Sequence, residues 1–145
     1  MTVTGASSSQ TMTLVSVLAG CSNTLSGIST VTVNPTPQVG NMTSNACSGD
    51  AIGVNLPTTS TNLVEVDKWN ITCTPPAGIT GTPTTGITTD LYAIIGDVFT
   101  NSTTSSIDVT YTVTPYAKTT VCAGASFTIK VTIYAPVVTS PISHN

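Results

Sequence analysis

The fold is decided by two alternating stretches, Ile-Asp-Val-Thr-Tyr-Thr-Val-Thr-Pro-Tyr at residues 107–116 and Phe-Thr-Ile-Lys-Val-Thr-Ile-Tyr at residues 127–134. In both stretches apolar side chains alternate with polar ones. Successive side chains of a strand point to opposite faces of a sheet, so each stretch is predicted to be a strand with one buried face. The segment between them, residues 115–123, is short enough to turn the chain back. This predicts an antiparallel hairpin with Cys122 at its tip.

A weaker copy of this hairpin lies at residues 11–35. Cys21 precedes Pro35 by 14 residues, and Cys122 precedes Pro136 by the same 14 residues. The two copies are about 100 residues apart, which is the usual length of one β-sandwich module. The spacing therefore predicts a repeat.

The stretch Pro35-Thr-Pro37 is the predicted domain boundary, because proline has no N–H to donate to a strand ladder. We expect a partial preceding repeat at residues 1–35, consisting of its closing hairpin, and a complete repeat at residues 36–136. Residues 137–145 are expected to be a tail or the start of the next repeat. The opening Met-Thr-Val-Thr is typical of a piece cut from a longer chain. We expect the N-terminal hairpin to pack against the complete unit, or against another copy of the chain, and to extend a sheet there.

The complete repeat contains further alternating segments and no apolar pattern of helical period. The largest side chain, Trp69, is predicted to anchor the core together with Ile71. Strands are expected at residues 38–42, 52–56, 67–73 and 91–99. Short strands of this kind in about 100 residues predict an all-β, immunoglobulin-like antiparallel β-sandwich.

The composition excludes several classes of partner. Charged residues make up 6% of the chain, against roughly a quarter in ordinary soluble domains, and the net charge is −3 with only three Lys and Arg residues. No basic patch can form for nucleic acid. No apolar run approaches the roughly 20 residues that a membrane-spanning helix needs. We therefore expect neither nucleic-acid binding nor membrane insertion.

Catalytic chemistry finds little support in the sequence. The only histidine, His144, lies near the C-terminus, so no serine or cysteine is predicted to have a histidine base. Glu65 and Asp67 lie two residues apart and are interpreted as the solvated start of a strand rather than an acid–base pair. No catalytic residue is assigned, and the protein is not expected to be an enzyme.

No cofactor is expected, although calcium stays open as an alternative. Hard oxygen ligands for calcium could come from Asp50, Asp90 and Asp97 together with loop carbonyls. The acids are scattered and form no Asp-x-Asp-x-Asp run. The four cysteines form no CxxC pair, which argues against zinc.

Widely spaced cysteines in a threonine-rich strand protein fit an oxidising, extracellular setting. Cys47 and Cys122 flank the complete unit, and each lies in a Cys-small-Gly turn. We predict that they form a disulfide, while buried free thiols are the alternative.

Aromatic side chains on the surface could contact a sugar or another surface. Tyr116, at the predicted hairpin tip, and Tyr134, on the outward face of its strand, are the candidates for an exposed contact. Trp69 and Tyr111 are expected to pack in the core instead.

Several motifs resemble the PKD-like repeats of very large Bacteroidetes cell-surface proteins. The resemblance covers residues 11–136 and is closest to the repetitive region of SprB-type gliding-motility adhesins. The motifs that carry it are Val31-Thr-Val-Asn-Pro-Thr-Pro, Ala46-Cys-Ser-Gly, Val109-Thr-Tyr-Thr-Val-Thr-Pro, Val121-Cys-Ala-Gly and Phe127-Thr-Ile-Lys-Val-Thr-Ile.

This resemblance implies a structural repeat of a secreted, filamentous adhesin on the bacterial cell surface, associated with the outer membrane. It implies roles in gliding motility and surface attachment. The implied partners are neighbouring repeats of the same chain, an external surface or polysaccharide, and the gliding machinery, which would act through other parts of the protein. A carbohydrate-binding module of a secreted hydrolase is the alternative function.

Overall fold

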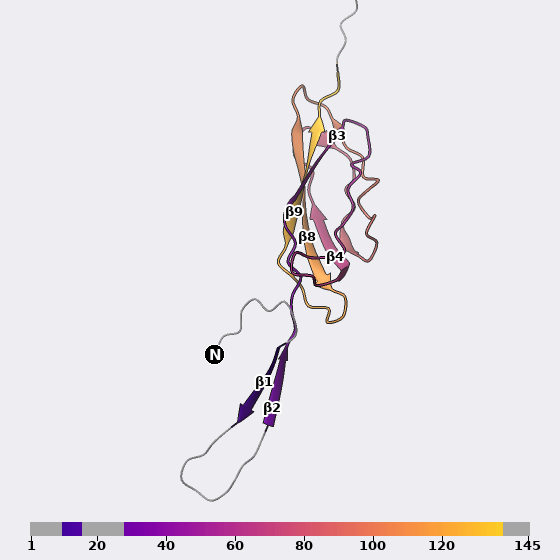
Figure 1. The fold of residues 1–145 in the computed structure, drawn as a ribbon. Coiled ribbons are helices and arrows are strands. Elements are labelled where there is room, and N and C mark those ends of the chain that lie inside the picture. Colours follow the sequence, from indigo (N-terminus) through magenta and orange to yellow (C-terminus); the bar gives the residue numbers. More distant parts are fainter. Residues whose placement is uncertain (1–9, 16–27, 138–145) are drawn as a thin grey trace, which may run out of the picture.

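The computed structural model describes residues 10–15 and 28–137, which form a small hairpin and a larger β-sandwich (Figure 1). The hairpin pairs β1 (Gln10–Val15) with β2 (Ile28–Val33) in antiparallel register. It forms a two-stranded sheet of its own and does not join the sheets of the sandwich. The prediction that it extends a sheet of the complete unit within the chain is therefore wrong. Packing against another copy stays a prediction.

The main sheet of the sandwich has five strands in the order β3-β9-β8-β4-β6. Alternation places Val109, Tyr111 and Val113 of the central strand on the buried face, as the sequence predicted. The predicted hairpin is confirmed, since β8 and β9 pair antiparallel. The strands are β3 (Met42–Cys47), β4 (Val66–Cys73), β6 (Gly86–Thr88), β8 (Ile107–Ala117) and β9 (Phe127–Tyr134).

One edge of this sheet differs from the prediction. The first strand was expected at residues 38–42, but β3 begins at Met42 and lies parallel to β9, with Met42 opposite Ile129. Residues 34–41 instead form an extended connector from the hairpin into the sandwich. The sheet is thus antiparallel except at this edge.

The second layer is held together mostly without regular strands. Residues 49–56 run along residues 91–99, and backbone N–H groups of Ile52 and Leu56 donate to Asp97 and Leu91 at 3.0 and 2.8 Å. β5 (Ile79–Thr80) and β7 (Thr100–Asn101) complete the layer as a short pair.

The predicted strands at 52–56 and 91–99 are therefore wrong as regular strands. Within 90–97, consecutive turns direct N–H groups back to carbonyls three residues earlier, for example from Ala93 to Asp90 at 3.2 Å. Those donors are lost to a ladder. The apolar alternation still holds, because Ile52, Val54 and Leu56 are all buried.

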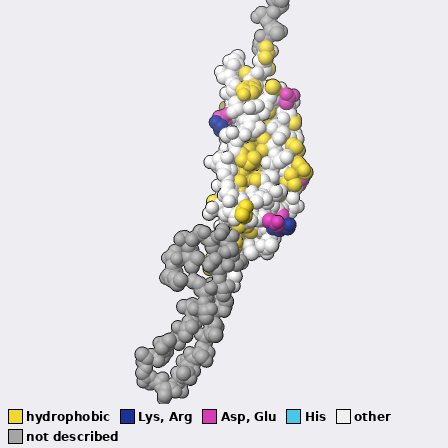
Figure 2. Space-filling model, viewed as in Figure 1, with side chains coloured by type: hydrophobic (Ala, Val, Ile, Leu, Met, Phe, Trp, Pro, Cys, Tyr) yellow, Lys and Arg dark blue, Asp and Glu magenta, His cyan; other side chains and the backbone are white. Residues whose placement is uncertain are grey.

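The core lies between the two layers. Trp69 and Ile71 of β4 are buried there, as predicted, and Phe99 packs edge-on against Tyr111 with ring centroids 6.3 Å apart. Figure 2 shows few charged side chains on the visible face, where acidic and basic groups lie next to each other. The all-β fold class is confirmed. No helix occurs in the ranges described, so none there could cross a membrane.

Removing the largest core side chain tests this packing. We expect Trp69→Ala to lower the free energy of unfolding by about 3–5 kcal/mol, because it leaves a cavity between the layers. Urea denaturation followed by circular dichroism measures the change. Ile87→Ala, at an exposed position of β6, should change stability by no more than about 0.5 kcal/mol. Equal effects of the two substitutions would contradict the assignment of Trp69 to the core.

Candidate functional sites

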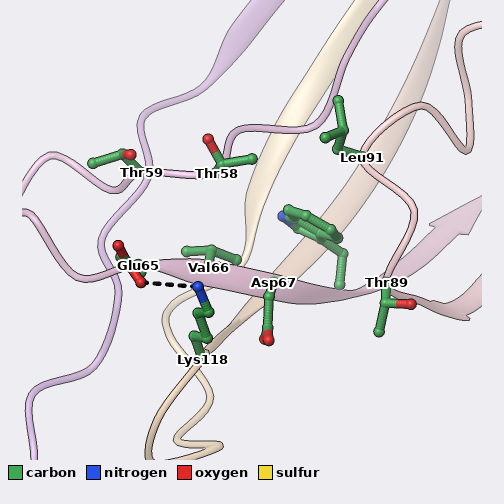
Figure 3. A pocket seen from close by; sticks show the side chains of 9 residues that line it. Thr58, Thr59, Glu65, Val66, Asp67, Thr89, Leu91 and Lys118 are labelled. Carbon is green, nitrogen blue, oxygen red and sulfur yellow. Dashed lines mark ion pairs between the residues drawn. The ribbon is translucent and has the colours of Figure 1, made fainter.

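A pocket with a volume of about 280 Å³ opens beside the start of β4. Three threonine hydroxyls lie around it, at Thr58, Thr59 and Thr89. The remaining lining residues are Glu65, Val66, Asp67, Trp69, Leu91 and Lys118 (Figure 3).

The charges of this pocket neutralise one another at its rim. Lys118 Nζ lies 3.2 Å from Glu65 Oε2, and the Lys118 backbone N–H donates to the Glu65 carbonyl at 3.0 Å. Both side chains are more than half exposed, so water screens the pair and it adds little stability. Figure 3 shows the Asp67 carboxylate directed away from Leu91, on the other side of the strand. The interpretation of Glu65 and Asp67 as a solvated strand start agrees with this geometry.

Trp69 forms part of the pocket wall but cannot serve as a sugar platform. Its side chain is buried, and its indole Nε1 is also buried without a hydrogen-bond partner among the described residues. A sugar stacks on an exposed ring face, which Trp69 does not offer. The pocket is thus a shallow polar hollow whose one ion pair is satisfied internally.

The two tyrosines predicted for exposed contacts do not form one surface. Tyr116 lies opposite Lys68 on β4, and Lys68 Nζ is 4.8 Å from the centre of its ring. Tyr134 is 45% exposed at the far end of β9, opposite Cys47. They lie at opposite ends of the sheet, so no single ligand of sugar size could contact both.

The three calcium candidates are also apart. Asp50 lies in an exposed turn, while Asp90 accepts a hydrogen bond from the Tyr92 backbone N–H at 2.9 Å. Asp97 is buried and bonded within the sandwich. Among the residues that the structure describes, no three acidic, histidine or cysteine side chains gather closely enough to hold a metal ion. The structure therefore does not support a site made of these acids.

Asp97 has a structural role that sequence reasoning missed. Its carboxylate accepts hydrogen bonds from the Tyr111 hydroxyl at 2.5 Å and from the Thr84 N–H and hydroxyl at 2.8 and 2.7 Å. Burial, followed by the hydrogen bond to Asp97, raises the pKa of Tyr111 well above its ordinary value. The tyrosine therefore remains a donor at neutral pH, and the bond ties the irregular layer to the central strand.

The predicted disulfide between Cys47 and Cys122 is wrong. The three described cysteines, Cys47, Cys73 and Cys122, carry free thiols. Cys47 is opposite Tyr134 at one end of β9, whereas Cys122 lies in the loop that precedes the other end. The eight residues of β9 separate them by roughly 20 Å at the usual rise of a strand, and a disulfide needs Cα atoms within about 7 Å.

A second candidate site is the connector that leads into the sandwich. The Asn62 side chain holds it like a fork, since Nδ2 donates to the Thr36 carbonyl at 2.9 Å and Oδ1 accepts from the Gln38 N–H at 3.1 Å. The Thr61 N–H donates to the Gln38 carbonyl at 2.7 Å. The Ser60 hydroxyl donates to Asn62 Oδ1 at 2.6 Å and orients the fork.

The connector is also held from its other side. Pro37 is fully buried, and its carbonyl oxygen lies 2.0 Å from where a Cβ on Gly124 would be. Only glycine permits this approach of the two backbones. Asn62 and Gly124 are thus functional candidates that the sequence did not reveal, because their partners are distant along the chain. We call the contacts of residues 36–38 with residues 60–62 and 124 the connector clamp.

The fold defines the class first, since two β-layers packed face to face make an extracellular-type β-sandwich module. A model of the PKD-like domain family matches residues 44–136, which is more than half of the chain, so the chain belongs to that family. PKD-like domains are generally non-catalytic and typically occur in extracellular or surface proteins. No curated protein and no solved structure matches the chain. The matched range begins within β3 and ends just after β9.

The bond between Asp97 and Tyr111 predicts a graded loss of stability. We expect Tyr111→Phe to lower the free energy of unfolding by about 1–3 kcal/mol, because it removes a buried hydrogen bond to a charged group. Asp97→Ala should lower it further, since it leaves three donors without an acceptor. Chemical denaturation measures both, and Asp50→Ala, at an exposed acid, is the control. If Asp97→Ala matched that control, the carboxylate would not be the anchor proposed here.

The thiol of Cys73 should react slowly in the folded protein. Burial, and then the negative charge of Asp97, raise its pKa from 9.0 to about 11. Near pH 8 this leaves roughly 100-fold less thiolate than an unshifted thiol has. Alkylation followed by peptide mapping should show slow modification that becomes rapid in urea. The unfolded thiol ionises first as pH rises from 9 to 11, so this group's contribution to stability is lost over that window. Cys73→Ala should weaken that pH dependence.

Proposed function

We propose that this chain is a structural repeat of a secreted, filamentous adhesin on the bacterial cell surface. In this proposal the adhesin takes part in surface attachment and gliding motility, and the repeat acts as a spacer and contact surface. Membership of the PKD-like family supports the proposal, because that family is typical of extracellular proteins.

The observation that carries the proposal is the matching register of two hairpins. Shifting β2 by 100 residues, from Val31 to Val131, and β1 by 97 residues, from Met12 to Val109, superimposes every pair of β1–β2 on a pair of β8–β9. The pair Met12 and Val31 thus corresponds to Val109 and Val131. Equal register supports a preceding repeat whose closing hairpin is β1–β2, and hence a series of modules.

The surface chemistry supports a spacer. The three lysines of the sequence are all engaged locally, since Lys118 pairs with Glu65, Lys130 with Asp108 at 2.9 Å, and Lys68 lies over a tyrosine ring. A surface with so little free charge exerts no strong field on a charged ligand. It suits many weak hydrogen-bonding contacts along a fibre.

Location and movement on living cells test the proposal. Fab fragments raised against this chain should label intact, unpermeabilised cells of the source, and beads coated with them should be carried along gliding cells. Treating intact cells with protease should abolish both results. Labelling that appears only after permeabilisation would contradict a surface repeat. Saturable binding on a glycan array, lost in Tyr116→Ala or Tyr134→Ala, would instead favour the carbohydrate-binding alternative.

A further inference from the structure

Two exposed aliphatic side chains lie in the two loops that hold the connector. Leu63 is 82% exposed and Val121 is 57% exposed. Both have left-handed backbone conformations, with φ of 61° and 56°. Such φ values favour glycine or asparagine, and a β-branched residue there is an outlier. An isolated module therefore gains neither burial nor a relaxed backbone from these residues.

The two loops lie side by side at one end of the sandwich. Val66 pairs with Ala117, and the Lys118 N–H donates to the Glu65 carbonyl, so residues 60–65 and 117–124 emerge next to each other. The connector clamp lies between them, because Thr36 bonds to one loop and Pro37 packs on the other. The preceding part of the chain thus enters at the end that presents Leu63 and Val121, as the hairpin does in Figure 1.

The opposite end shows the complementary feature. Val137, three residues beyond β9, is 91% exposed. In the 100-residue register that aligns β2 with β9, Val137 corresponds to Pro37, which is fully buried in the connector clamp. A following module would bury Val137 as this module buries Pro37.

We propose that Leu63 and Val121 form a docking surface for a second copy of the module, the one that precedes it in the same chain. The occupant is that copy's closing end, to which β1 and β2 correspond. The connector clamp sets the point at which the preceding module enters, and the two aliphatic side chains support it on either side, which makes the joint rigid. This inference rests on the proposed function, in which modules follow one another in series.

A chain with one additional module tests the docking surface. Residues 1–133 would be followed by residues 34–145, so that the natural sequence is kept and one full joint is added. Small-angle X-ray scattering should fit a single elongated shape. The variant carries Leu63→Gly and Val121→Gly in the second module only. It should fit only a broad distribution of bend angles.

Thermal unfolding separates docking from folding. Glycine adopts positive φ without strain, so the double variant of the natural 145-residue chain should melt at the same temperature or higher. Ile87→Ala in the second module removes an exposed aliphatic group far from the joint and should leave the scattering unchanged.

Two outcomes would overturn the docking surface. Either the natural two-module chain bends as freely as the double variant, or the double variant stays as rigid as the natural sequence. Failure of the proposed function has a different signature, namely absence of the protein from the cell surface. A rigid joint could still be measured in that case.

Discussion

The hydrogen bond from the Tyr111 hydroxyl to the Asp97 carboxylate is the contact on which the two-layer structure depends. The five-stranded sheet is held by a regular ladder, but the layer that covers it is largely irregular. Such a layer needs fixed points. Asp97 provides one, because it joins Thr84 and the 91–99 segment to the centre of β8 in a buried setting where each bond is strong. Asn101 acts similarly, since its amide donates to the carbonyls of Ser105 and Ile133.

The same economy of charge extends to the ends of the module. The connector clamp uses neutral amides, hydroxyls and backbone groups, and the close approach of Pro37 to Gly124 needs no charge at all. Neutral hydrogen bonds and packing depend little on salt, whereas exposed ion pairs weaken as ionic strength rises. A joint of this kind suits a module that works outside the cell in media of varying salinity.

The candidate sites were harder to predict than the fold. Glu65, Asp67, Tyr116 and Tyr134 could be placed on strand faces from alternation alone. The disulfide prediction failed because similar turn sequences around Cys47 and Cys122 say nothing about which end of the sheet each turn occupies. Asp97 was considered only as a metal ligand. Its real partners, Thr84 and Tyr111, are 13 and 14 residues away and bear no sequence mark of their pairing.

The sequence by itself determined the all-β class, the β8–β9 hairpin, the burial of Trp69 and Ile71, and the register of the repeat. Each of these follows from period-two alternation, which is a local property because neighbouring side chains of a strand must point to opposite faces. Only the tertiary structure decided that β3 lies parallel to β9, that residues 91–99 form turns, and that Asn62 and Gly124 hold the connector. These outcomes depend on hydrogen bonds and close contacts between segments far apart in the chain, for which local alternation carries no information.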